Sequence, residues 1–409
     1  MLLEMPPRAP ASASSIGDRR AIQHLLDARA SAVMTGDRRA FMATVATDSP
    51  AFVQRQRELF DWMREVPLRS YRLTAAWQRL GDLARPGDAA RYPDARRVAI
   101  PVTEERYRIR GFDDAPAEED LFYTFIEKGD RWLVAGDTDL NGLGLETTRH
   151  LWDFGPVTAS RSRHFLMLEH PCSARIGCAH LPSGILALAE KALARVHRLW
   201  PVPWHRRIVI LAPTTASELH RMLQATFDVS KFVAFAYSSE DVEHGLRFTG
   251  PRIILSWRAI TGRSTESTVT ILAHELTHIA TRASSGPEMP LFVEEGLAEY
   301  VGYSGDPSSL AYLNSIVHGG SFDGRLPRDY QFTTGSGRDI YLSYQKGEAA
   351  VRFFLDRWGM SKFARFYRSL GHQRVVPGTD RFRLDQALHR TIGIDLSQFQ
   401  KLWASSLRR

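Results

Sequence analysis

The chain has 409 residues, of which 44% are hydrophobic and 24% are charged, and its formal net charge is +7. This composition is that of a folded globular protein and argues against disorder, and the length allows two or three separate hydrophobic cores. The 53 basic and 46 acidic residues are spread along the sequence, so the concentrated basic face that nucleic-acid binding requires is not expected.

Residues 1–15 are rich in Pro, Ala and Ser and predict a flexible lead-in. They lack the apolar stretch of a secretory signal, and the sequence has no run of about 18 apolar residues, so we expect neither a targeting signal nor a transmembrane segment in this chain. The compartment stays open, and a missing upstream leader would allow an extracytoplasmic location. The oligomeric state stays open too. Cys172 and Cys178 fit a small disulfide loop and two free thiols equally well.

Two helices followed by strands are predicted for the first part of the chain. Apolar residues at helical spacing predict a helix over about 18–35, ended by Gly36, and a second helix over about 49–64. Strand-like segments follow at 71–77, 97–108, 121–127 and 132–137, with a turn at 128–130. This order predicts an α+β domain over 16–145. The order, together with the segment Ala-Val-Met-Thr-Gly-Asp-Arg-Arg-Ala-Phe, resembles the cone-shaped fold of nuclear transport factor two and SnoaL-like proteins.

A linker is predicted at 146–162, where Gly, Thr and Pro interrupt any period. A second domain then occupies 163–409, which makes the chain a two-domain α+β protein. Its first part alternates predicted strands and helices, in the order strand 164–169, helix 183–199, strand 207–212, helix 215–224, strand 232–237 and strand 252–257.

The motif His-Glu-x-x-His lies inside a helical pattern at His274, Glu275 and His278. Residues four apart stand one turn above each other on a helix, so the two histidines can bind one zinc ion. Glu275 can then take a proton from a metal-activated water, which is the general-base role of this motif. Zinc needs a third protein ligand if its fourth position is to stay open for water.

The next segment, Glu294-Glu295-Gly296-Leu-Ala-Glu299, resembles the second helix of gluzincin metallopeptidases. The resemblance makes Glu295 the third ligand and Glu299 the carboxylate that orients His274 through its other ring nitrogen. Glu294 is the alternative ligand in a shifted register, but Ala298 would then stand where the orienting carboxylate belongs.

Segments on either side of the motif extend the resemblance to peptidase MA-like proteins over 163–407. Tyr344 is the preferred donor to the oxyanion, and Tyr341 is the reserve; a packing role for Tyr344 remains the main alternative. His318 and His372 are weaker candidates. The resemblance also makes 252–257 the edge strand that an extended peptide could pair with, and 385–407 the closing helices. It implies a zincin-like domain with a small mixed sheet, an active-site helix and C-terminal helices.

These patterns together predict a zinc metallopeptidase with one Zn²⁺ per chain and a peptide or protein substrate. The substrate-binding residues are unknown, and aminopeptidase activity is doubtful because the Gly-x-Met-Glu-Asn stretch is missing. One alternative is an inactive zinc-binding protein that acts through a ligand-binding or interaction site in its N-terminal domain. Another is a peptidase that acts on one specific protein only.

Overall fold

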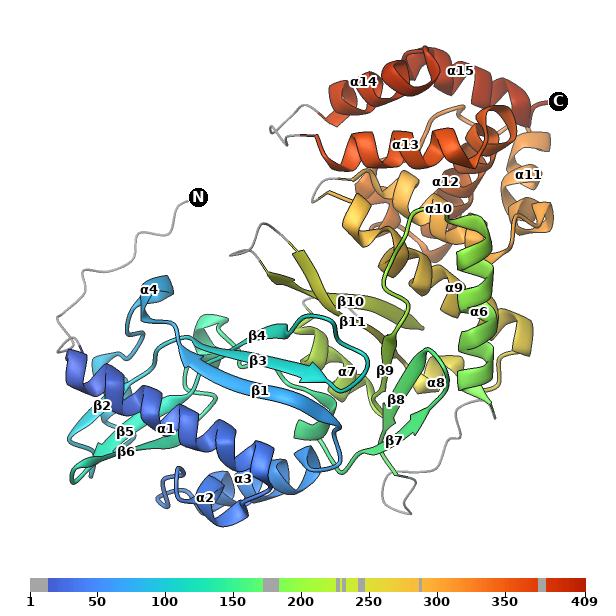
Figure 1. Ribbon diagram of the computed structural model, residues 1–409. Helices are drawn as coiled ribbons and strands as arrows, with labels where there is room; N and C mark the ends of the chain where they lie inside the picture. The colour runs from blue at the N-terminus through green and yellow to red at the C-terminus, as the bar shows by residue number, and fades with distance from the viewer. Residues whose placement is uncertain are drawn as a thin grey trace.

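The computed structural model describes residues 14–171, 184–225, 229, 233–241, 247–286, 289–373 and 380–409. Within them the chain is mixed α and β with small sheets, as the predicted α+β class requires (Figure 1). The elements as far as β8 are α1 (Ile16–Thr35), α2 (Arg38–Met42), α3 (Pro50–Met63), β1 (Leu68–Ala75), α4 (Trp77–Leu80), α5 (Pro86–Ala89), β2 (Arg97–Ala99), β3 (Thr103–Ile109), β4 (Ala117–Leu121), β5 (Thr124–Lys128), β6 (Arg131–Gly136), β7 (Thr158–Arg161) and β8 (Phe165–Glu169). The later elements are α6 (Ile185–Leu199), β9 (Ile208–Ala212), α7 (Ala216–Leu223), β10 (Ala234–Asp241), β11 (Arg247–Leu255), α8 (Trp257–Ile260), α9 (Thr265–Thr281), α10 (Leu291–Gly302), α11 (Ala311–His318), α12 (Gly337–Trp358), α13 (Met360–Gly371), α14 (Asp380–Ile392) and α15 (Leu396–Leu407).

The two predicted N-terminal helices are confirmed. The side chain of Ser15 caps α1, and Gly36 ends it with a φ of 70°, a left-handed conformation that glycine adopts without strain. The side chain of Ser49 caps α3, and Pro50 occupies its first turn. Local chemistry therefore accounts for the start of both helices and for the end of α1.

The N-terminal strands form two separate three-stranded sheets, ordered β1-β3-β4 and β2-β5-β6. The prediction of one strand over 97–108 is wrong, because β2 and β3 belong to different sheets. Pro101 lies between them, and a proline has no N–H to continue the strand ladder. The prediction of one strand over 121–127 is wrong for a similar reason, since the chain changes sheet between β4 and β5. The predicted turn at 128–130 is confirmed as the β5–β6 hairpin.

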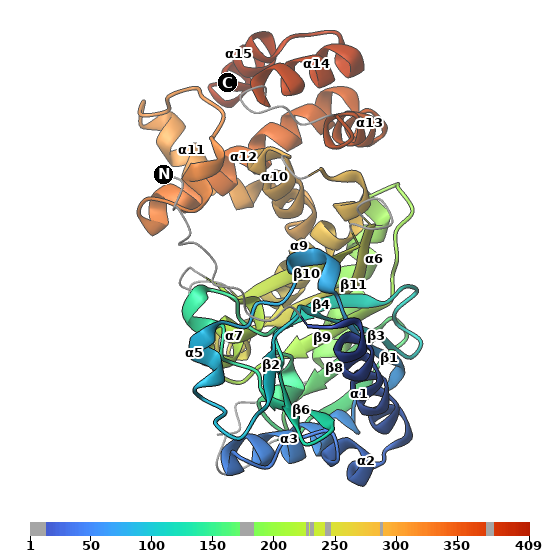
Figure 2. The same ribbon diagram turned by 90° about the vertical axis from the view of Figure 1, so that its left-hand side faces the viewer.

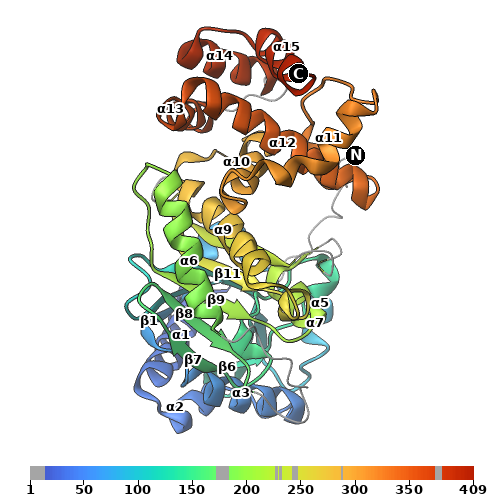
Figure 3. The ribbon, with the colours of Figure 1, turned by 90° about the vertical axis from the view of Figure 1, so that its right-hand side faces the viewer.

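A five-stranded sheet, ordered β10-β11-β9-β8-β7, forms the centre of the molecule. Along β9, Ile208 and Ile210 enter the hydrophobic core on the side of α6 and α9, whereas Val209 and Leu211 enter the core on the N-terminal side. Figure 3 shows α6 lying across the sheet. The run Ile-Val-Ile-Leu is apolar throughout because both faces of this strand are covered.

The prediction that segment 252–257 is the edge strand of the sheet is wrong. Strand β11, which contains the predicted segment 252–257 as far as Leu255, pairs with β9 on one side and with β10 on the other. Strand β10 therefore forms the edge of the sheet. It pairs antiparallel with β11 over Ala234–Asp241, and so occupies the side of β11 that was expected to be free.

The segment predicted as a linker, 146–162, contains strand β7 and contributes Leu151 and Trp152 to a buried cluster. The same cluster includes Ile109 from the N-terminal part and Leu166 from the central sheet. Apolar packing is therefore continuous across the predicted domain boundary.

Helices α10 to α15 pack at the end of the molecule away from α1–α3 (Figures 1 and 2). The predicted closing segment 385–407 is helical as part of α14 and as α15. None of the helices in the part of the chain described above combines the length and the hydropathy that a bilayer span requires. Cys172 and Cys178 lie outside the described residues.

Candidate metal centre

Helix α9 holds the His-Glu-x-x-His motif. The Ser264 side chain accepts a hydrogen bond from the Ser267 N–H at 3.2 Å and so caps the N-terminus of the helix. The buried face of α9, which includes Leu272 and Leu276, fixes the rotation of the helix against the core. His274 and His278 therefore project from the same side, one turn apart.

Helix α10 brings Glu295 to the two histidines. Two glycines, Gly296 on α10 and Gly347 on α12, allow α12 to pack closely against α10. A Cβ atom on Gly296 would overlap the carbonyl oxygen of Gly347, so the backbones of α10 and α12 touch at this crossing. Gly347 lies three residues after Tyr344, near the middle of α12. The glycine pair thus places Tyr344 beside His274.

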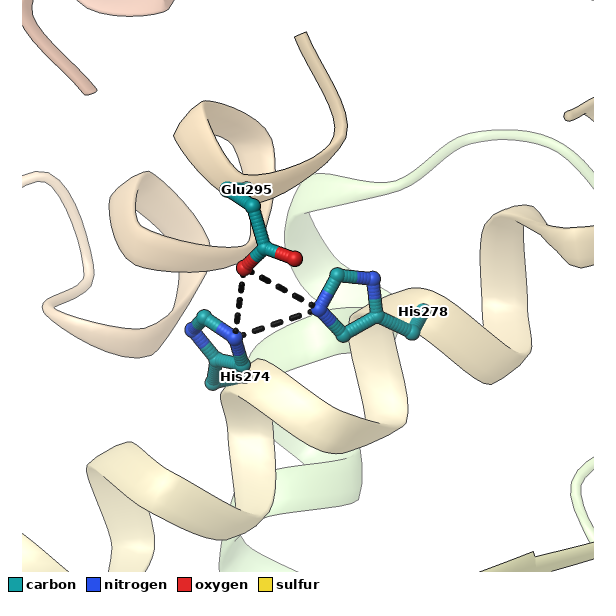
Figure 4. A group of neighbouring side chains, drawn as sticks. All are labelled: His274, His278 and Glu295. Atoms are coloured by element: carbon teal, nitrogen blue, oxygen red, sulfur yellow. Dashed lines mark hydrogen bonds and ion pairs between the residues drawn. The ribbon is translucent and has the colours of Figure 1, made fainter. Parts of the chain in front are cut away.

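Three donor atoms converge between α9 and α10 (Figure 4). His274 Nε2 lies 3.1 Å from His278 Nε2 and 3.2 Å from Glu295 Oε2, and His278 Nε2 lies 3.5 Å from the same oxygen. Two ligands about 2.0–2.1 Å from a tetrahedral zinc ion are about 3.3–3.4 Å apart. The three side chains therefore fit one face of a tetrahedral coordination shell, and they form one group that could hold a metal ion.

The neighbouring glutamates have separate partners. Glu299 Oε1 lies 3.0 Å from Nδ1 of His274, the nitrogen that faces away from the convergent atoms. Glu294 lies outside the convergent group and instead accepts a hydrogen bond from the Ser285 hydroxyl. The geometry therefore brings together the predicted His274, His278, Glu295 and Glu299. Glu294, the alternative ligand in the shifted register, does not belong to the group of convergent atoms.

Charge is concentrated around the convergent atoms. Burial disfavours the imidazolium form of His274, but Glu295 and Glu299 outweigh it and raise the pKa of His274 well above its usual range. Burial opposes ionisation of Glu295 too, yet His278 and His274 hold its pKa well below the ordinary value. The carboxylates thus favour a positive charge between the rings, which either protons or a metal cation can supply. Because a bound metal must displace these protons, its affinity falls as the pH falls.

Glu275 faces a cleft of about 630 Å³ that also exposes the convergent atoms. Its side chain is buried, and burial raises its pKa, although the two histidines oppose the rise. The backbone of Ala236 on β10, which lines the same cleft, opposes the rise in the pKa of Glu275 as well. A carboxylate with a raised pKa beside a metal group is suited to accept and return a proton.

The two tyrosines differ in position. Tyr344 lines the cleft, packs edge-to-face against Phe332 at 5.1 Å between ring centroids, and lies 6.5 Å from the ring of His274. Burial, reinforced by the charges of Glu295, Glu299 and Glu275, raises the pKa of Tyr344, so its hydroxyl stays protonated. Tyr341 is 46% exposed and stacks on Tyr312, away from the residues that line the cleft.

The two histidine candidates outside the motif lie elsewhere. His318 ends α11, where its Nδ1 contacts the carbonyl oxygen of Asn314 at 2.7 Å. His372 is the exposed residue after α13. Neither residue lines the cleft.

Several residues that line the cleft were not predicted from the sequence. They come from β4, β10 and the end of α9, and they are Glu118, Tyr237, Ser238, Ser239 and Arg282. Strand β10 was predicted in part, as 232–237, but its place at the edge of the sheet was not. Glu118 carried no signal, because its strand has the composition Ala-Glu-Glu-Asp-Leu, which is poor in strand-forming residues.

No protein-family model matches this chain, and a search of curated proteins finds no similar sequence.

Proposed function

We propose that this chain is a zinc-dependent metallohydrolase of the gluzincin peptidase type. The observation that carries the proposal is the convergence of His274, His278 and Glu295, with donor atoms 3.1–3.5 Å apart, on a cleft that Glu275 also faces. Two imidazole nitrogens and one carboxylate oxygen are a typical ligand set for catalytic zinc, which keeps its fourth position open. One zinc ion is expected per chain.

A zinc ion held there would lower the pKa of a water molecule toward about 7 and polarise the substrate carbonyl. Glu275 accepts a proton from the attacking water and then donates it to the leaving nitrogen. Glu299 fixes the tautomer and orientation of His274 by its contact with Nδ1. The Tyr344 hydroxyl, which stays protonated, donates to the oxygen that becomes negative during the attack.

The peptide substrate and the zincin-like assignment of 163–409 rest on the resemblance of the Glu-Gly-Leu-Ala-Glu segment and its surroundings to peptidase MA-like proteins. In this proposal 16–145 is a cone-like domain and the chain has two domains. Because β10 is the edge strand and lines the cleft, we assign the main-chain pairing with an extended peptide to β10 in place of 252–257.

Metal analysis of the purified protein tests the proposal directly. Wild type and Glu275→Gln are both expected to hold one zinc ion per chain, and only wild type is expected to cleave a broad peptide library. Glu295→Gln should lose zinc, whereas the matched variant Glu294→Gln should keep it. A wild type without stoichiometric zinc contradicts the proposal, and a zinc-loaded wild type that cleaves nothing favours the inactive alternative.

The alternative in which the N-terminal part binds a small ligand has less physical support. A cavity lined by Tyr71, Glu105, Tyr123, His150 and their neighbours encloses only about 20 Å³. That is room for about one water molecule, whereas ligand pockets are typically about 300–1,000 Å³. The cleft at the histidines is the larger opening by far.

A further inference from the structure

The hairpin formed by β3 and β4 contacts the central sheet where β10 and β11 lose their regular register. Between Tyr237 and Ser239 the pairing shifts, because Ser239 lies opposite Thr249 and Tyr237 lies opposite Arg252. Two residues of β11, Gly250 and Pro251, thus face a single residue of β10. An irregularity of this kind is a β-bulge, which bends the strand and frequently lies next to active sites.

Two contacts from the hairpin hold β11 at the bulge. The Arg252 guanidinium forms two hydrogen bonds, of 2.7 and 2.8 Å, with the Asp113 carboxylate, and both side chains are buried. Gly250 has a φ of 55°, and a Cβ atom placed on it would lie 2.6 Å from the Cβ atom of Ala117. The hairpin therefore fits the bulge through close backbone packing and through a buried ion pair.

A third contact holds β10 itself. The Tyr237 hydroxyl donates to Glu119 Oε1 at 2.6 Å, and the Ser239 hydroxyl donates to the same oxygen at 3.0 Å. Tyr237 and Ser239 are two residues apart, so both point toward the same face of the strand. One carboxylate on β4 thus binds two positions of the edge strand, on either side of the bulge.

The opposite side of β10 contacts the candidate catalytic helix. Strand β10 packs against α9 as well as against β4, and the three elements lie close together in Figure 2. Ala236, the residue before Tyr237, lines the cleft together with Glu275, and its backbone lowers the pKa of the Glu275 carboxyl. A displacement of β10 would therefore displace a partner of the general base.

We propose that Glu119 is a positioning residue for the metal site: through Tyr237 and Ser239 it fixes edge strand β10, and through β10 it fixes Glu275. The inference rests on the proposed function for its catalytic part. It makes the N-terminal α+β part a component of the cleft, and Glu118, the residue before Glu119, lies in the lining of the same cleft. The acidic strand β4 thus forms part of the wall of the cleft.

Matched substitutions along β4 test the inference. Glu119→Gln removes the charge that the two hydroxyls share, and Tyr237→Phe removes one hydroxyl but keeps the aromatic ring. Asp120→Asn is the control, because Asp120 is the next carboxylate of the strand but pairs with Arg79 at the surface. Hydrogen–deuterium exchange is measured without substrate in peptides covering 233–241, and zinc content is measured for every variant.

We expect exchange in 233–241 to be about tenfold faster in Glu119→Gln and Tyr237→Phe than in wild type, the loss that corresponds to one hydrogen bond to a charged group. Asp120→Asn should exchange like wild type, and all three variants should keep zinc. In peptide cleavage, kcat should fall about tenfold in the first two variants, because β10 lies beside the base. KM should rise as well, because β10 is also the strand assigned to pair with the peptide.

Unchanged exchange in both Glu119→Gln and Tyr237→Phe overturns the inference, and so does unchanged kcat in an active enzyme. If the wild type cleaves no peptide, the proposed function fails. The exchange experiment then still decides whether Glu119 positions β10.

Discussion

Two clusters of histidine and carboxylate in this protein use the same residue types but differ in what surrounds them. In the N-terminal part, His150 Nε2 lies 2.5 Å from Glu105 Oε2, and the His150 ring stacks on Trp152 beside a cavity of about 20 Å³. At the other cluster, His274, His278 and Glu295 direct three atoms toward one point on a cleft of about 630 Å³. A pair closed on itself is a structural ion pair, whereas three convergent donors with access to solvent can bind a metal.

The largest expected effect belongs to Glu275. Glu275→Gln keeps the size of the side chain but removes the base, so kcat for peptide cleavage should fall about 10²- to 10⁴-fold at unchanged zinc content. The equivalent change in the cluster of His150 and Glu105, Glu105→Gln, should leave kcat within about threefold of wild type. If kcat fell by a similar factor in both variants, the conclusion that only the cluster of His274, His278 and Glu295 serves catalysis would be wrong.

Tyr344→Phe should lower kcat about 10²- to 10³-fold, the cost of losing one donor to the oxyanion. The control is Tyr341→Phe, because Tyr341 lies outside the cleft lining and 46% of it is exposed. Steady-state kinetics of both variants on one peptide measure the difference. Equal activities of Tyr344→Phe and wild type would show that Tyr344 only packs against Phe332.

The ion pair of His150 and Glu105, by contrast, should make the free energy of unfolding depend on pH. Although burial opposes it, the Glu105 carboxylate raises the pKa of His150 from 6.5 to about 9. The stabilisation is therefore fully present below pH 6.5 and is lost as the pH rises through about 9. Its size is about 3 kcal/mol, at about 1.36 kcal/mol per pKa unit.

Chemical unfolding of the zinc-saturated protein at about pH 6 and pH 9.5, compared with that of Glu105→Gln, measures this loss. His274 and His278 release zinc and bind protons on unfolding in both proteins, so their contribution cancels in the comparison. Glu105→Gln should show a much smaller difference between the two pH values. If wild type and Glu105→Gln lost the same free energy of unfolding between the two pH values, the pH dependence would belong to other groups.

Glu299→Gln should have the smallest effect, a loss of about 10- to 100-fold in zinc affinity, as is usual for a carboxylate that orients a metal-bound histidine. Competition with a chelator of known affinity measures it. Glu348→Gln is a control on the neighbouring helix, since the Glu348 carboxylate contacts Ser309 and Arg352 in place of a histidine. If the chelator removes zinc equally well from wild type and Glu299→Gln, the assigned role of Glu299 is wrong.

The helical side of the candidate site was predictable because its chemistry follows helical spacing. His274 and His278 are one turn apart on α9, and this period can be recognised in the sequence. Glu295 and Glu299 were indicated by the resemblance of their segment to the second helix of gluzincin metallopeptidases. The sequence favoured Tyr344 over Tyr341 but could not decide between them, because both lie on one helix. In the structure Tyr344 lines the cleft and Tyr341 does not.

The strand side of the site was not predictable for a different reason. Strand β4 has three consecutive acidic residues, and its contacts with β10 join positions more than 100 residues apart, such as Glu119 and Tyr237 with a separation of 118. The misplacement of the edge strand has the same origin, since strand order depends on pairing between segments and not on the composition of either one. Likewise, the break at Pro101 was visible in the sequence, but the change of sheet was not.

The crossing of α10 and α12 at Gly296 and Gly347 has a consequence for how the site tolerates motion. Side chains can change rotamer, but two backbones in contact can move closer only by strain, and they can separate only if one of the helices moves out of the core. The spacing between Glu295 and Tyr344 is therefore set by the main chain. We expect the backbones that carry the carboxylate and the phenol to move as one rigid unit, so that backbone fluctuations of the cleft arise mainly at β10, on the opposite wall.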